Sequence, residues 1–136
     1  MNNDTIGFGG GCHWCTEAVF QSLRGVQTVE QGFITSIPPH DSYSEAALLG
    51  YDPKIISLDV LIDVHLRTHA STSHHKMRGK YRSAIYVHSD AQAEAALRKI
   101  KQSQPDFEDP IVTLVIPHKG FKASPPQFQN LSLIHI

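Results

Sequence analysis

Two cysteines three positions apart, Cys12 and Cys15, are the residues whose type and spacing most directly indicate chemistry in this 136-residue sequence. They follow the run Gly9-Gly10-Gly11, and glycines let a backbone turn sharply and a ligand approach closely. A cysteine that opens a helix lies beside unpaired N–H groups and the positive end of the helix dipole, which stabilise a thiolate. We therefore predict that Cys12 is a nucleophile. Cys15, one helical turn later, lies within reach for a disulfide if that turn loosens.

Other uses of the two cysteines stay open. Free cysteines are often buried and inert, although the glycine run and the helix start favour a reactive thiol here. A zinc site is a second alternative, in which the cysteines share the metal with two histidines. The candidate histidines are His65, His69, His74 and His75. No histidine pair follows at the usual finger spacing, and the glycine run lacks the residues that complete phosphate- and dinucleotide-binding loops.

The composition limits the classes of protein to which the sequence can belong. The formal net charge is −1, with 40% hydrophobic and 18% charged residues, which is typical of one globular domain over residues 1–136. No cluster of Lys and Arg indicates a nucleic-acid surface, and no apolar stretch approaches the ~20 residues that span a bilayer. Residues 1–4 lack the basic and apolar segments of a signal peptide. We expect a cytoplasmic monomer that binds neither nucleic acid nor membrane.

The elements that must position the cysteines follow one another in an irregular order. Hydrophobic periodicity and turn residues predict strands over 5–8, 26–34, 43–51, 81–87 and 111–116, and helices over 12–23, 57–68 and 89–103. Ser57 and Ser89 are suited to cap two of these helices. Residues 119–136 are expected to be poorly defined, as a truncated tail, and the ending 131–136 is either a terminal strand or foreign sequence left by truncation or cloning. The order β-α-β-β-α-β-α-β predicts an α+β layer fold.

Several segments resemble the A-type peptide methionine sulfoxide reductase (MsrA) family, and they occur in the family's order. They are Gly9 to Glu17, where Gly-Cys-His-Trp stands for the family's Gly-Cys-Phe-Trp; Ser44-Glu45-Ala46; Tyr51-Asp52-Pro53; residues 55–69; and Tyr81 to Tyr86. The resemblance covers roughly residues 5–117. It implies the family's fold, a two-layer, ferredoxin-like mixed sheet with packed helices.

The resemblance implies thiol-dependent reduction of methionine-S-sulfoxide, free or in peptides and proteins, as a repair of oxidative damage. Cys12 would attack the sulfoxide sulfur and become a sulfenic acid, which Cys15 would resolve as a disulfide. Glu45 matches the family's acid, which protonates the leaving oxygen, and its apolar neighbours would favour the protonated form. Tyr81 matches a tyrosine that hydrogen-bonds this oxygen. Trp14 matches the aromatic wall that holds the substrate methyl group.

Departures from the family concern the substrate pocket and the recycling of the thiol. His13 replaces the usual phenylalanine and adds a group that titrates near neutral pH. The segment before the acid strand is shortened to residues 34–42, so Tyr43 is the candidate to replace a missing pocket tyrosine. The family's acidic residue before the Tyr-Arg-Ser strand is absent, and so are the C-terminal recycling cysteines of many members.

The resemblance implies no cofactor, and thioredoxin or another dithiol would return the disulfide to thiols. Two rival functions stay open. The first is a general thiol-disulfide oxidoreductase that uses Cys12 and Cys15, and the second is a non-catalytic module that binds zinc or a sulfoxide. Replacing Glu45 with Gln would separate the first rival, since it should cripple sulfoxide reduction and spare disulfide exchange.

Overall fold

The computed structural model describes residues 4–10, 19–67, 82–108 and 110–123. They contain a six-stranded sheet with the strand order β5-β4-β1-β3-β2-β6. The strands are β1 (Asp4–Gly9), β2 (Val26–Thr35), β3 (Ser44–Tyr51), β4 (Ala84–Val87), β5 (Leu114–Pro117) and β6 (Gly120–Ala123). β4 and β5 are parallel and the other neighbouring pairs antiparallel, so the sheet is mixed, as predicted.

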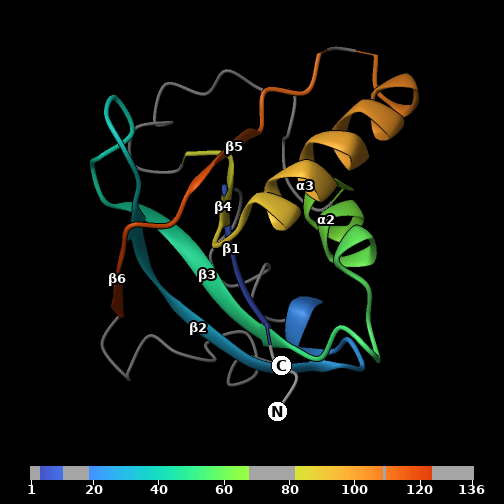
Figure 1. The fold of residues 1–136 in the computed structure, drawn as a ribbon, viewed down its shortest axis with the longest axis horizontal. Helices are drawn as coiled ribbons and strands as arrows, with labels where there is room; N and C mark the ends of the chain where they lie inside the picture. Colours follow the sequence, from blue (N-terminus) through green and yellow to red (C-terminus); the bar gives the residue numbers. More distant parts are fainter. Residues whose placement is uncertain (1–3, 11–18, 68–81, 109, 124–136) are drawn as a thin grey trace.

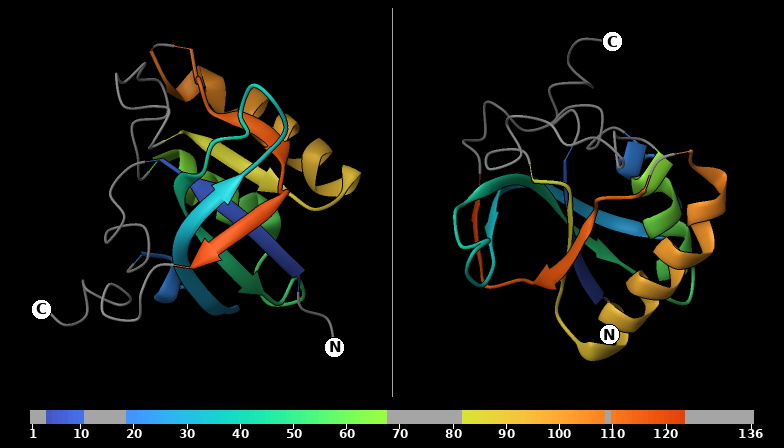
Figure 2. Two further views of the ribbon diagram at one scale, coloured as in Figure 1. Left: turned by 90° about the vertical axis from the view of Figure 1, so that its left-hand side faces the viewer. Right: turned by 90° about the horizontal axis from the view of Figure 1, so that it is seen from above.

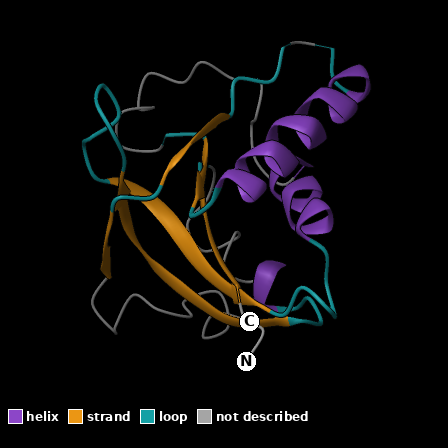
Figure 3. Ribbon diagram, in the orientation of Figure 1, coloured by secondary structure: helices purple, strands orange, loops and turns teal. Residues whose placement is uncertain are grey.

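Two helices, α2 (Leu58–Arg67) and α3 (Asp90–Ser103), lie on one face of the sheet, and the short 3-10 helix η1 (Gln104–Asp106) follows α3 (Figures 1 and 3). Their N-termini form where the sequence predicts caps. Oγ of Ser57 accepts a 3.3 Å hydrogen bond from the N–H of Val60, and Oγ of Ser89 accepts one of 3.2 Å from the N–H of Gln92. These bonds satisfy amides that have no partner inside the helix.

The main core lies between the helices and the sheet. Alternate residues of the strands point toward α2 and α3, as the period of two in a strand requires. Its buried members include Ile6, Phe8, Phe20, Leu49, Tyr51, Leu61, Ile62, Leu66 and Ile85. The intervening residues point to the opposite face and form a smaller cluster of Ile34, Ala46, Ala84, Tyr86 and Ile116. The sheet is therefore buried on both faces over its central strands.

The smaller cluster is covered by the sheet itself, which bends round on that side (Figure 2). β5 and β6 stand at opposite margins of the sheet, yet only His118 and Lys119 separate them in the chain. The N–H of His118 donates to the carbonyl of Val87 on β4, and the N–H of Lys119 donates to that of Thr35 on β2, both at 3.0 Å. Two adjacent residues thus join both sides of the sheet and hold its curvature.

Most of the predicted elements are confirmed, and the terminal prediction is corrected. The segment 119–136, expected to lack defined structure, contains β6, which pairs with Gly32–Thr35 of β2. β5 begins at Leu114 rather than at residue 111. Of the helix predicted over 12–23, residues 19–21 are helical and 11–18 lie outside the described residues. No helix in the described ranges is long and apolar enough to cross a membrane.

Candidate active site

Three segments of the family resemblance meet at Gly9, the last residue of β1. Since β1 runs antiparallel to both neighbours, its end lies beside the beginnings of β3 and β4, and Gly9 pairs with both Ala46 and Ala84. A Cβ on Gly9 would lie 2.6 Å from the carbonyl oxygen of Arg82 and 3.4 Å from that of Glu45. The glycine therefore allows three backbones to approach closely at this point.

Five of the predicted site residues lie outside the described residues: Cys12, His13, Trp14, Cys15 and Tyr81. Cys12 follows Gly9 by three residues and Tyr81 precedes Ala84 by three. Gly9 and Ala84 pair with each other at the end of the sheet at which Glu45 lies.

Glu45 is half-buried on the helix-facing side of β3, which it shares with the core residues Ala47 and Leu49. In the antiparallel register it stands directly opposite Phe33 of β2, so the two side chains project from the same face. Phe33 is half-buried too. Phe33 is not predicted as a site residue from the sequence, because only strand register makes it a neighbour of Glu45.

Arg82 fixes the backbone around this end of the sheet. Only 4% of its surface is exposed, and its guanidinium donates to the carbonyls of Ile34 at 3.1 Å and Ser42 at 3.0 Å. Its Nε donates to the hydroxyl of Tyr86 at 3.0 Å. A planar fork of donors can hold several oxygens at fixed angles, so Arg82 ties the loop before β3 to β2 and β4.

Ser44 adds a second tie between the same strands. Its Oγ accepts a 2.7 Å hydrogen bond from the N–H of Arg82, and its side chain is also hydrogen-bonded to Tyr86. Burial raises the pKa of the Tyr86 hydroxyl, although the Arg82 charge and these hydrogen bonds act in the opposite direction. The phenol therefore stays protonated at neutral pH as a fixed member of the network.

His65 reaches the same junction from α2. Its Nε2 donates a 2.8 Å hydrogen bond to the carbonyl of Gly9, and the side chain is buried. Its ring packs against Phe8, with centroids 4.6 Å apart, and Phe8 stacks on Phe20 at 5.0 Å. The zinc alternative counted His65 among its ligands, but Nε2 is already used by this carbonyl. Its other candidate ligands lie outside the described residues.

The family of the chain follows from a match along nearly its whole length. A family model described as "Peptide methionine sulfoxide reductase" matches residues 4–132. The chain belongs to the peptide methionine sulfoxide reductase family. This reductase is an α+β enzyme that reduces methionine sulfoxide, as the sequence predicted.

Individual relatives agree with the assignment. Peptide methionine sulfoxide reductase MsrA 1 of Rhodopirellula baltica is 33% identical to the reductase over 135 residues, which cover 89% of this chain and 70% of the relative. Methionine sulfoxide reductase A of Corynebacterium diphtheriae has a similar structure, with a TM-score of 0.82 at 24% identity, covering 98% of this chain and 74% of the other. Mxr1 of Saccharomyces cerevisiae, solved in complex with Trx2, gives a TM-score of 0.75 at 24% identity, with 95% and 84% covered. The two solved proteins share the fold of the reductase.

Tyr43 of the reductase points toward a different strand from the one that ends at Gly9. Its ring is 49% exposed, its hydroxyl is close to Gly120, and Nζ of Lys122 lies 5.5 Å from the ring centroid. A cation over an aromatic face is a favourable contact. Tyr43 is thus held against β6. Its role in substrate binding stays a prediction.

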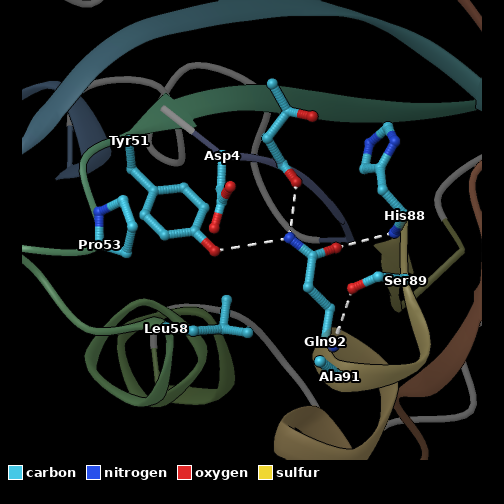
Figure 4. Close-up of a pocket in the computed structure, with 9 residues that line it drawn as sticks. Asp4, Tyr51, Pro53, Leu58, His88, Ser89, Ala91 and Gln92 are labelled. Carbon is cyan, nitrogen blue, oxygen red and sulfur yellow. Dashed lines mark hydrogen bonds between the residues drawn. The ribbon is translucent and has the colours of Figure 1, made fainter. Parts of the chain in front are cut away.

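A cavity of about 400 Å³ lies at the opposite end of β1 from Gly9 (Figure 4). Gln92 bridges its wall: its Nε2 donates to the carbonyl of Thr5 at 2.8 Å and to the hydroxyl of Tyr51 at 3.5 Å, and its Oε1 accepts from the N–H of His88 at 2.7 Å. Burial raises the pKa of Tyr51. Neither Glu45 nor Tyr43, the two predicted site residues that the structure describes, lines this cavity.

Metal chemistry finds no support in the part of the reductase that the structure describes. Within residues 4–10, 19–67, 82–108 and 110–123, no group of three or more His, Cys, Asp or Glu side chains is arranged to hold an ion. The two cysteines lie outside these ranges, so the zinc alternative is a matter for metal analysis of the purified protein.

Proposed function

We propose that Cys12 is the nucleophile of the reductase and that Glu45 and Tyr81 act on the sulfoxide oxygen. The observation that carries the proposal is the meeting of three chain segments at Gly9. The segment that leads to Cys12, the strand start that bears Glu45 and the strand start that follows Tyr81 share this one residue as a neighbour. General acid catalysis requires such proximity between the acid and the departing oxygen.

The proposed reaction proceeds in two stages. The Cys12 thiolate attacks the sulfur of methionine-S-sulfoxide and forms a bond to it, and the S–O bond breaks as Glu45 protonates the oxygen, with Tyr81 donating a hydrogen bond to it, so that the oxygen leaves as water. Attack of this water on Sγ of Cys12 then breaks the bond to the substrate sulfur, which releases methionine and one proton and leaves Cys12 oxidised to a sulfenic acid. The Cys15 thiol then attacks this sulfenic acid, which gives a Cys12–Cys15 disulfide and one molecule of water.

The substrate would be held by the side chains next to the nucleophile. Trp14 and His13 would form the wall around the methyl group, and Tyr43 would contact a more distant part of the substrate. Phe33 supports this proposal from the described residues, because it stands directly opposite Glu45 in the strand register and projects from the same face of the sheet.

An external dithiol would close the cycle by reducing the disulfide. The structure of yeast Mxr1 with Trx2 supports a thioredoxin-like protein as this reductant. We propose that the reductase uses no cofactor of its own, since two thiols and a dithiol donor account for both electrons. Action as a single-domain monomer in the cytoplasm stays a prediction from the sequence.

The test is turnover of the separate S and R epimers of methionine sulfoxide with dithiothreitol as the reductant. We expect reduction of the S epimer only, and complete loss in Cys12→Ser. Cys15→Ser should turn over with dithiothreitol, which can reduce a sulfenic acid directly, and should fail with thioredoxin. Sulfoxide reduction that persists in Cys12→Ser would refute the assignment of the nucleophile.

Glu45→Gln distinguishes this function from general thiol-disulfide exchange. The amide cannot protonate the sulfoxide oxygen, so we expect turnover of the S epimer to fall about 100-fold or more. Exchange of the Cys12–Cys15 disulfide with a model dithiol needs no such acid and should be unchanged. Equal losses in both assays would point to a folding defect, and unchanged sulfoxide turnover would remove Glu45 from the mechanism. One zinc ion per chain in freshly purified protein would argue against a redox role.

A further inference from the structure

We propose that His65 is a positioning residue of the reductase, which orients the turn leading to Cys12 through the carbonyl of Gly9. The inference rests on the proposed role of Cys12 as the nucleophile and adds a residue that lies on another element. His65 belongs to α2, far along the chain from the glycine run. Its hydrogen bond to Gly9 joins this helix to the strand end from which the cysteine segment departs.

The bond shows which ring nitrogen of His65 carries a proton. A carbonyl oxygen can only accept, so Nε2 of His65 must carry a proton to make the 2.8 Å contact. Only 1% of the side chain surface is exposed, and a hydrogen bond inside a protein core is strong because water does not compete for either partner. The Gly9 carbonyl thus has a hydrogen-bond donor on α2, the Nε2–H group of His65.

Both ends of the cysteine segment rest on one aromatic stack. Phe8 immediately precedes Gly9, and Phe20 lies just after the segment. Their rings are stacked at 5.0 Å with an angle of 7° between the planes, and the His65 ring packs on Phe8 at 4.6 Å. All three residues are buried, so His65 cannot rotate away without disturbing the contact that brings the segment's two ends together.

The orientation of the Gly9 carbonyl matters because Gly10 is the pivot of the turn. Gly10 has a φ of 103°, a conformation that side-chain-bearing residues rarely adopt, and it has no side chain to anchor it. The peptide between Gly9 and Gly10 is planar, so a fixed carbonyl also fixes the opposite direction of the Gly10 N–H. Without the His65 bond, this peptide could rotate and change the direction in which the chain leads to Cys12.

Three substitutions separate positioning from packing. His65→Gln can bring an amide N–H to about the place of Nε2, whereas the shorter side chain of His65→Asn reaches only the place of Nδ1. His65→Phe keeps a planar ring on Phe8 and removes the donor. If His65 were needed only to fill the core, the Phe variant would retain the highest kcat of the three.

The measurements are kcat and KM for the S epimer with dithiothreitol, and the pH profile of Cys12 alkylation by iodoacetamide in a Cys15→Ser background. We expect His65→Phe and His65→Asn to lower kcat about tenfold or more and to move the alkylation profile to higher pH, since misplacement by about 1 Å is costly in an active site. His65→Gln should keep kcat within about threefold. Denaturant unfolding of each variant reports stability separately.

The inference is overturned if folded His65→Phe retains the parent kcat and alkylation profile, or if His65→Gln is no better than His65→Asn. Loss of folding in all three variants would also overturn it, because His65 would then be required for stability rather than for the thiol. Failure of the proposed function has a different signature, namely turnover in the parent protein that persists in Cys12→Ser.

Discussion

The N–H of Arg82 donates a 2.7 Å hydrogen bond to Oγ of Ser44, across the beginnings of β4 and β3. Arg82 follows Tyr81 in the chain, and Ser44 precedes Glu45. One hydrogen bond therefore links the immediate neighbours of the two residues proposed to act on the sulfoxide oxygen. A small displacement of either strand start would be passed to the other through this bond.

Replacing Ser44 with Ala should lower kcat/KM for the S epimer without unfolding the protein. The substitution removes two buried hydrogen bonds, one from the N–H of Arg82 and one with Tyr86, at about 0.5–1.5 kcal/mol each, and a total of about 1–3 kcal/mol corresponds to a decrease of about 5-fold to 150-fold. Ser36→Ala is the matched control, because Ser36 is also buried and its hydroxyl has no hydrogen-bond partner among the described residues. Steady-state kinetics of both variants makes the test. Equal kcat/KM values in the two would show that the Ser44 link does not affect the site.

Gly9→Ala should reduce turnover far more than Gly7→Ala. A Cβ on Gly9 would lie 2.6 Å from the backbone oxygen of Arg82, which the sheet holds in place. On Gly7 the nearest atom, also at 2.6 Å, is the terminal methyl group of Ile34, which can rotate aside. We expect Gly9→Ala to separate the strand starts at the site, whereas Gly7→Ala alters mainly the smaller cluster. Similar kcat values in two folded variants would contradict this account.

Gln92→Met should cost stability and spare activity. The substitution keeps the length of the side chain but leaves the carbonyl of Thr5 and the N–H of His88 without their partner, at about 1–3 kcal/mol. Figure 4 shows the contacts of Gln92, and Thr5 stands near the beginning of β1, whereas Gly9 is its last residue. Denaturant unfolding should show a lower midpoint, and kcat at 25 °C should equal that of the parent. A decrease in kcat in the folded variant would mean that the two ends of β1 are coupled.

The His88–His118 pair should make the reductase less stable in acid. Nδ1 of His118 and Nε2 of His88 lie 3.0 Å apart, and burial lowers the pKa of both rings, with the charge of His88 adding to the effect on His118. When the folded-state pKa is below the unfolded value near 6.5, stability is complete above about pH 6.5 and is lost as the pH falls below it.

The double variant His88→Gln/His118→Gln removes these two titrations. Its free energy of unfolding should therefore fall less steeply than that of the parent between about pH 6.5 and pH 5. The comparison is made by urea unfolding at a series of pH values, with pH 8 as the reference, where both rings are neutral in either state. Parallel curves for the two proteins would exclude the pair as a source of acid sensitivity.

Local signals in the sequence account for the elements that were predicted correctly. Ser57 and Ser89 cap their helices because capping needs only a hydroxyl a few residues from the amides that it serves. β6 was missed because its four residues carry a weak strand pattern and become a strand only by pairing with β2. Its partner is distant in the sequence, and no local pattern reports such a pairing.

The same distinction between local signals and long-range contacts applies to the residues of the candidate site. Glu45 could be named because its neighbours resemble a family segment, and the structure puts it on the side of β3 that faces the helices. Phe33, His65 and the guanidinium of Arg82 could not be assigned these contacts, since each acts on a residue that is remote in the chain. Register and helix packing bring these groups to the site, and neither can be derived from the spacing of residues in the sequence.

The two-residue connection from β5 to β6 has a consequence for how these molecules behave at high concentration. β6 occupies the hydrogen-bonding side of Gly32–Thr35 on β2, a strand that would otherwise offer a long row of unpaired N–H and C=O groups to another molecule. β6 itself has four residues, including an exposed lysine, Lys122, and short, charged margins are poor templates for further strands. The curled sheet thus covers four residues of the β2 edge with a short strand, so fewer unpaired N–H and C=O groups are left there for a strand of another molecule.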